Sequence, residues 1–211
     1  MAVSDPIGSG FVKTLSHPGG NMTGFTNLES SLGEKWLQLL KEIAPRVSRV
    51  AVMFNPKTAT WAFYLPTIAA AACRLGITQF AARVESEADI ARVIEDIGRQ
   101  PGSGLLCMAD IYMATYGKRI SQLAAANKVP TIHFFMGAVQ DGALIAYGVD
   151  IGESVRQAAA YVDRILRGAQ PKDLPVQQPS KFEMAVNKTT AKALGLTIPQ
   201  SILLRADRVV E

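Results

Sequence analysis

The sequence predicts an α/β fold built on a parallel, doubly wound sheet. Three observations support this fold class. Continuous apolar runs such as residues 50–54 are typical of strands that are covered on both faces. These runs alternate with helical segments of roughly 10 to 15 residues, as βαβ units do. The chain is also long and apolar enough to bury a core without covalent help, with 211 residues of which 48% are hydrophobic.

The first well-defined element is a helix at residues 31–43. Trp36, Leu39, Leu40 and Ile43 form an apolar stripe with helical spacing. Ser31 and Glu34 have the spacing of a capping box, and Pro45 ends the helix. Upstream of it the sequence predicts a short strand at residues 2–3, a turn at Asp5-Pro6, a helix through residues 11–15 and a segment at residues 21–27.

A regular alternation follows this helix. Residues 86–97, for example, place their branched apolar side chains on one face of a helix. The predicted elements are strand 49–54, helix 61–75, strand 77–84, helix 86–97, strand 105–109, helix 116–127 and strand 130–134.

The rhythm changes after residue 135. A strand at 143–147 and a helix at 153–166 lead to a proline-rich stretch at 170–179, which we interpret as a connector or hinge. A strand at 182–186, a short helix capped by Asn187 and a last segment at 199–211 complete the chain.

We therefore expect one complete α/β lobe at residues 46–135. Residues 1–45 and 143–211 are expected to form a second, partial lobe together with the crossovers between the lobes. A sheet with so few strands leaves an exposed edge, which favours pairing with a second copy of the chain.

Charge and composition exclude several classes of function. There are 22 Lys and Arg against 18 Asp and Glu, and a net charge of +4 is too small to argue for nucleic acid, which requires many phosphates to be neutralised. No apolar stretch is long enough to cross a bilayer, and the first residues lack the pattern of an export signal.

The two cysteines, Cys73 and Cys107, are expected to be buried and unpaired. Their spacing, and that of His17 and His133, does not predict a metal or redox site.

Polar and aromatic residues follow several predicted strands. In open α/β sheets ligands bind outside the carboxyl ends of the strands, where the loops meet. The candidate ligand-binding residues at these positions are Ser4, Asp5, Asn55, Thr58, Asp110, Phe134 and Tyr147, with His133 beside them.

Each of these residues also has a purely structural interpretation. Asn55 and Asp110 are typical caps of turns and helices, and Asp5 before proline typically opens a turn. His133 is expected to be a core residue with its hydrogen bonds satisfied rather than a ligand or base. Tyr147 also fits core packing with its hydroxyl hydrogen-bonded. Only their coincidence at one edge favours a ligand site.

Enzyme signatures are weak. Residues 7–10 resemble part of a dinucleotide-binding loop, but the third glycine is missing. There is no nucleophile elbow, phosphate loop or His-Glu-x-x-His motif. We expect no catalytic residues, cofactor or metal.

A set of longer strings carries a family resemblance. They are SDPIGSG at 4–10, HPGGNMTGF at 17–25, GEKWLQLLKEIAP at 33–45, VAVMFNP at 50–56, YGVD at 147–150, YVDRILRG at 161–168, DLPV at 173–176, KFE at 181–183 and KALGLTIP at 192–199. Together they resemble the ABC-transporter substrate-binding proteins that include the TrpX-like aromatic amino-acid binders.

The resemblance implies a type I periplasmic-binding-protein fold with two lobes that close over a small solute. Ser4, Asp5 and Tyr147 would then lie on the first lobe and hinge, and Asn55, Thr58 and Asp110 on the second. The expected ligand is an aromatic or other amino acid, with Asp110 or Asp5 facing its ammonium group and Phe134 or Trp61 facing its side chain.

The resemblance also implies an ABC permease as partner and a periplasmic or extracytoplasmic location. Members of the family begin with an export signal and the first half of lobe one, neither of which the resemblance finds here. The sequence is therefore expected to be N-terminally truncated, and to stay in the cytoplasm if it is expressed as given. The alternative function is a cytoplasmic effector-sensing or regulatory module of the same fold.

Overall fold

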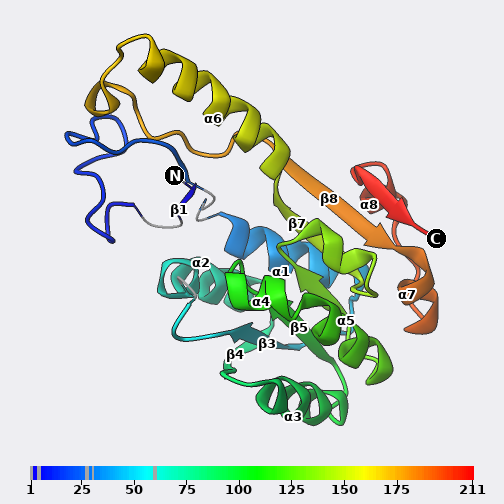
Figure 1. Ribbon diagram of the computed structural model, residues 1–211. Coiled ribbons are helices and arrows are strands. Elements are labelled where there is room, and N and C mark those ends of the chain that lie inside the picture. The colour runs from blue at the N-terminus through cyan, green and yellow to red at the C-terminus, as the bar shows by residue number, and fades with distance from the viewer. Residues whose placement is uncertain (1, 4–5, 27–28, 30, 59–60) are drawn as a thin grey trace. The chain divides into compact units, whose positions relative to one another are not determined.

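A seven-stranded sheet organises the larger of the two units into which the chain divides (Figure 1). The computed structural model describes residues 2–3, 6–26, 29, 31–58 and 61–211. The large unit consists of Ser30–Gly148 and Glu183–Glu211, and the small unit of Met1–Glu29 and Val149–Phe182.

The strands of the sheet are ordered β4-β3-β5-β6-β7-β8-β9. Their bounds are β3 Arg49–Phe54, β4 Thr78–Arg83, β5 Ser103–Cys107, β6 Thr131–His133, β7 Ile145–Val149, β8 Phe182–Asn187 and β9 Arg208–Val210. The pairs β3/β4, β3/β5, β5/β6, β6/β7 and β8/β9 are parallel. The α/β class with a mostly parallel sheet is thus confirmed.

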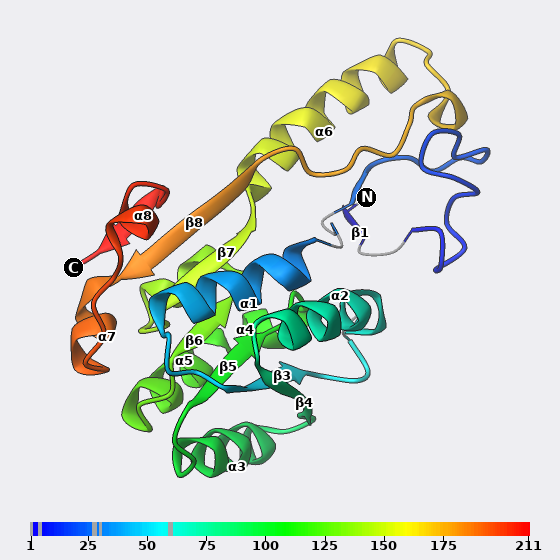
Figure 2. The same ribbon diagram turned by 180° about the vertical axis from the view of Figure 1, so that it is seen from behind.

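Helices cover both faces of this sheet. Those of the large unit are α1 Leu32–Ile43, α2 Trp61–Arg74, α3 Glu87–Gly98, α4 Ile111–Thr115, α5 Gly117–Ala126, α7 Lys188–Ala193 and α8 Gln200–Leu203, with a 3-10 turn at Met136–Val139. Figure 2 shows α1 and α2 on one side of the strands and α3 on the other. Helices pack on both faces of the sheet because β3 and β5 carry apolar side chains on both faces.

The side-chain alternation of the strands explains this layering. Met53 and Cys107 point to the face on which Ile94 of α3 packs. Gly104 points to the opposite face, where a β-carbon would lie 3.1 Å from a methyl group of Leu40 in α1. A strand without a side chain at this position lets α1 approach closely.

The small unit contains β1 Ala2–Val3, β2 Phe25–Thr26, α6 Ile151–Leu166 and a 3-10 turn at Pro171–Asp173. The backbone of its proline-rich stretch pairs with the N-terminal segment, since Val176 N–H donates to the Leu15 carbonyl at 2.7 Å and Thr26 N–H to the Gln177 carbonyl at 2.8 Å. The stretch predicted as a connector is therefore part of a packed unit.

The unit boundaries differ from the expected division at residues 46–135. The helix α1 belongs to the large unit, and the strands β8 and β9 extend the same sheet that β3 to β6 begin. The apolar stripe of α1 placed it correctly as a helix, but the sheet that it covers depends on pairing between distant strands.

Two local expectations were wrong. Ser31 makes no side-chain capping bond, because it has helical backbone angles (φ −66°, ψ −16°) while a capping side chain requires an extended backbone. Cys73 is exposed on α2, whereas Cys107 is buried as expected, and both thiols are free.

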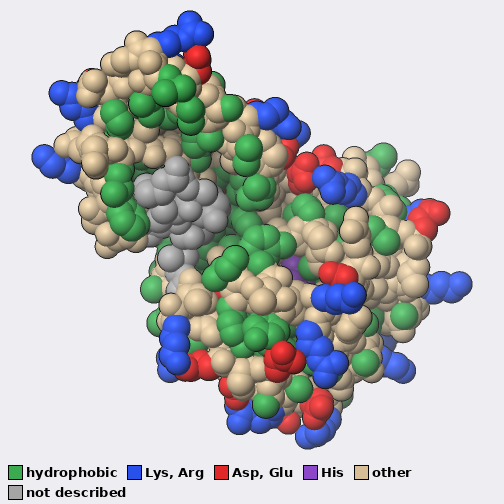
Figure 3. Space-filling view, viewed as in Figure 1, with side chains coloured by type: hydrophobic (Ala, Val, Ile, Leu, Met, Phe, Trp, Pro, Cys, Tyr) green, Lys and Arg blue, Asp and Glu red, His purple; other side chains and the backbone are tan. Residues whose placement is uncertain are grey.

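Charges on the large unit are interspersed. On the face shown in Figure 3, Lys and Arg side chains alternate with Asp and Glu. Many of them pair, as Arg205 does with Glu42 at 2.7 Å and Arg92 with Asp89 at 2.6 Å. Within the described part of the chain, no helix has the length and apolar character that a membrane span requires.

Candidate ligand-binding site

The loops after β3 and β5 meet at the carboxyl edge of the large unit's sheet. The two strands are parallel neighbours, with Met53 opposite Cys107. Their carboxyl ends therefore lie side by side, and the residues that follow them come together. Thr58 Oγ1 donates to Asp110 Oδ1 at 3.2 Å, so these two predicted site residues are in contact.

The two carboxylate oxygens of Asp110 differ. Oδ1 accepts the Thr58 hydroxyl and also the Met113 backbone N–H at 3.0 Å, which caps α4. Oδ2 is buried and has no hydrogen-bond partner among the described residues, and the residue as a whole is only 5% exposed. A buried acceptor without a partner carries a desolvation cost of about 1–3 kcal/mol, more when it is charged.

Burial raises the pKa of the Asp110 carboxyl above its ordinary value. The hydrogen bonds from the Met113 backbone N–H and the Thr58 hydroxyl oppose this effect without cancelling it. A cationic donor placed at Oδ2 would remove the penalty that burial imposes on the charged form.

Asn55 has a structural role at the start of the same loop. It is 4% exposed, and its side-chain Oδ1 accepts the Lys57 backbone N–H at 2.8 Å. This is an Asx turn, so the alternative that Asn55 caps a turn is correct. Asp110 likewise caps a helix, but only with Oδ1.

His133 lies at the carboxyl end of β6, opposite Cys107 of β5. It is 2% exposed, and its Nε2 has no hydrogen-bond partner in the parts of the chain that the structure describes. Burial lowers the pKa of His133 to about 4, so the imidazole is neutral at pH 7. The predicted core position of His133 is correct. The expectation that its hydrogen bonds are all satisfied is wrong, because Nε2 lacks a partner among the described residues.

Phe134 and Tyr147 are connected through Trp36 of α1. The Trp36 and Phe134 rings meet edge to face with centroids 6.3 Å apart, and Trp36 Nε1 donates to the Tyr147 carbonyl at 2.7 Å. Phe134 is 2% exposed, so its ring packs inside the unit, whereas Tyr147 is half-buried.

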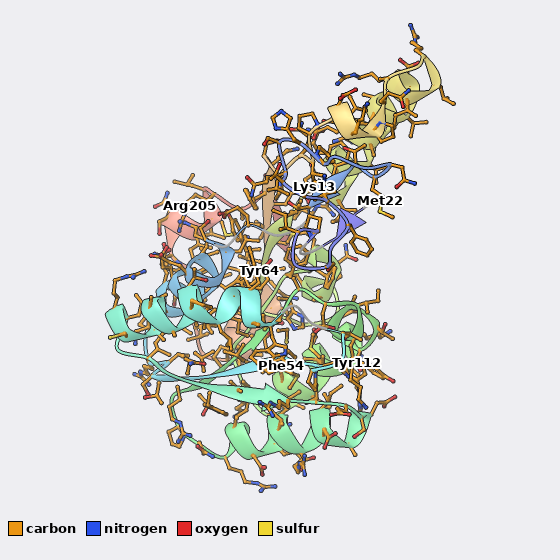
Figure 4. The ribbon with its side chains drawn as sticks, turned by 90° about the vertical axis from the view of Figure 1, so that its left-hand side faces the viewer. Lys13, Met22, Phe54, Tyr64, Tyr112 and Arg205 are labelled. Atoms are coloured by element: carbon orange, nitrogen blue, oxygen red, sulfur yellow. The ribbon has the colours of Figure 1, made fainter. Side chains whose placement is uncertain are left out.

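A second aromatic pair lies beside the polar loop. Trp61, at the start of α2, stacks on Phe54 with centroids 5.2 Å apart and an interplanar angle of 23°. Phe54 directly precedes Asn55, and Trp61 is half-buried. Figure 4 labels Phe54 on β3, Tyr64 on α2 and Tyr112 on α4, the three elements that surround this edge.

The packing of Trp36 against Tyr64 was not predicted from the sequence. Their rings lie 5.0 Å apart and both side chains are essentially fully buried. In the sequence Trp36 belongs to the apolar stripe of a helix, and nothing in that spacing distinguishes a core residue from one that supports a site.

The structure thus brings Asn55, Thr58 and Asp110 to one loop cluster and connects Phe134 with Tyr147. Ser4 and Asp5 lie outside the described residues. Among the residues that are described, no group of three or more Asp, Glu, His or Cys side chains could hold a metal ion.

Comparisons with known proteins identify several similar proteins. A curated relative, the tyrosine-binding protein of Clostridioides difficile (strain R20291), is 26% identical over 195 residues, which cover 92% of this chain and 56% of the relative. The chain thus spans about half the length of that protein.

Two solved structures are similar over nearly the whole chain. An ABC domain from Streptococcus pneumoniae in complex with L-Trp has a TM-score of 0.89 and 26% identity, covering 99% of this chain and 70% of that one. A conserved domain protein from Vibrio cholerae has a TM-score of 0.87 and 30% identity, covering 98% and 69%.

The family model described as "ABC transporter substrate binding protein" matches residues 1–210. The strings that carried the resemblance are therefore parts of one continuous match. The chain belongs to the family of ABC-transporter substrate-binding proteins.

Proposed function

We propose that the large unit binds a small zwitterionic solute, an amino acid with an aromatic side chain, at the carboxyl edge of its sheet. One observation carries the proposal. Asp110 Oδ2 is a buried carboxylate oxygen that has no partner in the described part of the chain, at the edge where open α/β sheets bind ligands. The named ligands of two relatives, tyrosine and L-Trp, belong to this chemical class.

The surroundings of Asp110 suit the two ends of such a solute. An ammonium group at Oδ2 would supply the missing donor and favour the ionised carboxyl. The half-buried Trp61, stacked on Phe54, offers an aromatic surface beside the loop that holds Asn55 and Thr58. Aromatic rings pack against one another in such offset or tilted arrangements.

We further propose that the bound solute is delivered unchanged to an ABC permease, outside the cytoplasm. The family match supports binding without catalysis, and favours it over the effector-sensing alternative. Nothing in the comparisons supports the homodimer expected from an exposed sheet edge.

Isothermal titration calorimetry with L-Trp and L-Tyr tests the proposal. Asp110→Asn keeps an oxygen that can cap α4 but removes the charge that would face the ammonium. Hydrogen bonds to charged groups contribute about 1.5–3 kcal/mol, so we expect the Kd to rise by about 10- to 150-fold.

Asp96→Asn is the matched control, since it removes an exposed carboxylate of α3 that pairs with Arg99. It should leave the Kd unchanged. Equal affinity of the Asp110→Asn variant and the parent would contradict the proposal.

A stability measurement separates lost binding from lost folding. The pKa of Asp110 is raised in the folded state, so its contribution to stability is present at low pH and is lost as the pH rises through that pKa. At pH 7 the unliganded Asp110→Asn variant should therefore be at least as stable to urea as the parent, although it binds more weakly.

A further inference from the structure

We propose that the large unit has a second small-molecule site, at the amino edge of its sheet, for an organic anion with an apolar body. The site is a pocket of about 550 Å³, a size typical of small-molecule sites. It is lined by the end of α1, the loops before β3 and β6, the start of β5 and the loop after α7. Figure 2 shows the ends of α1, α5 and α7 near one another.

The pocket is amphipathic. Its wall contains the apolar side chains Ile43, Val47, Pro130, Leu194 and Leu196. Its charged lining residues are Arg46 and Lys128 alone, and no Asp or Glu lines it. An apolar body flanked by cations fits a carboxylate attached to a hydrocarbon or aromatic group.

The two cations are not engaged elsewhere. Arg46 and Lys128 are exposed, and in the described part of the chain neither makes an ion pair. Other basic residues of the unit do pair, such as Arg205 with Glu42. An anion in the pocket would supply the negative charge that Arg46 and Lys128 do not find in the described part of the chain.

The C-terminal ends of the helices around the pocket carry partial negative charge, and the positive side chains of Arg46 and Lys128 lie beside them. Backbone donors satisfy one carbonyl at each of two helix ends. Ala44 N–H donates to Leu40 O at 2.9 Å, and Leu196 N–H to Ala191 O at 2.9 Å. Lys41 Nζ donates to the Val47 carbonyl at 2.7 Å, which adds a further positive charge near the pocket.

Lys128 is held in an unusual conformation. Among the described residues it is the only one other than glycine with a positive φ, 57°. Glycine is favoured at such a position after a helix. Its N–H donates to Ala125 O at 3.1 Å, and the N–H of Val129 donates to Ala124 O at 2.9 Å. These hydrogen bonds fix the backbone position from which the Lys128 side chain extends.

Ser103, the first residue of β5, also lines the pocket and is 8% exposed. Its Oγ is buried and has no hydrogen-bond partner among the described residues, so the hydroxyl does not face the open space of the pocket. The donors that an anion in the pocket would meet are therefore the Arg46 and Lys128 side chains.

Benzoate is the probe for this site, and the uncharged benzamide is its matched control. In NMR titrations we expect benzoate to shift the amide signals of Gly102, Ser103 and Lys128, and benzamide to bind at least 10-fold more weakly. Equal affinity for the two compounds, or benzoate shifts confined to other residues, would overturn the proposal.

The variant Arg46→Gln/Lys128→Gln should weaken benzoate binding by at least about 10-fold. The control Lys118→Gln/Arg119→Gln removes two exposed charges of α5 that do not line the pocket, and should bind benzoate as the parent does. If both variants lost the same amount of benzoate affinity, the loss would be explained by the change in net charge alone, and the proposed site would be contradicted.

The site is independent of the one proposed for amino acids, because Asp110 lies at the opposite edge of the strands. Asp110→Asn should lose affinity for L-Trp and keep its affinity for benzoate. Retained L-Trp binding in this variant would contradict the amino-acid site alone, and an absent benzoate response at Ser103 would contradict the anion site alone.

Discussion

At the scale of single residues, the two carboxylate oxygens of Asp110 have different environments. Asp110 uses Oδ1 to cap α4 and to hold Thr58, while Oδ2 stays buried without a partner. Asn55 also follows a buried strand, but its Oδ1 accepts a hydrogen bond from the Lys57 backbone N–H and so forms a turn. The proposed ligand-binding role of Asp110 thus depends on one oxygen atom.

His133 should make the stability of the chain dependent on pH. Its folded pKa is about 4 and the unfolded value is about 6.5, so between these values only the unfolded state takes up the proton. Stability should therefore fall as the pH is lowered from 6.5 to 4, by about 3 kcal/mol from this residue.

Urea unfolding of the parent and of His133→Leu at several values between pH 4 and 7 measures this. The difference between the two curves isolates the imidazole, because other groups titrate in both. Parallel pH profiles would show that His133 is not buried as a neutral group.

At the scale of elements, the close approach of β7 to the end of β6 depends on a glycine. A β-carbon on Gly148 would lie only 2.2 Å from the carbonyl oxygen of Phe134 and 3.1 Å from its ring. The bulk of any side chain here would push β7 away from the residues that contact Trp36.

Gly148→Ala should therefore destabilise the large unit by about 1–3 kcal/mol, as overpacking of a core does. Gly137→Ala is the matched control, since a β-carbon there meets no atom within 4 Å. Thermal unfolding should show a lower Tm for the first variant and little change for the second. Equal Tm values would contradict the close approach.

At the scale of the whole molecule, binding and stability are linked. A ligand that binds only the folded state at about 100 times its Kd adds about 2.7 kcal/mol. For a chain of this size, that corresponds to a rise in Tm of about 5 to 10 °C.

L-Trp should produce this rise in the parent. Indole, which has the same ring system without the ammonium and carboxylate groups, should produce a much smaller one, because it offers no cationic ammonium group to Asp110. A rise with indole equal to that with L-Trp would show that the charged ends of the solute are not recognised.

The order and type of the elements could be predicted from the sequence because they depend on local periodicity. The buried run of β3 and the helical stripe of α3 lie within two residues of their predicted bounds. The strings shared with a family extended this prediction to the function, since they preserve many residues over the whole chain.

Tertiary structure decided what local pattern does not contain. Strand pairing between distant segments placed β8 and β9 in the same sheet as β3, and so moved the unit boundaries. Burial by neighbouring elements left Asp110 Oδ2 and Ser103 Oγ without partners. These properties depend on which groups surround an atom in space, and residues far apart in the sequence supply those groups.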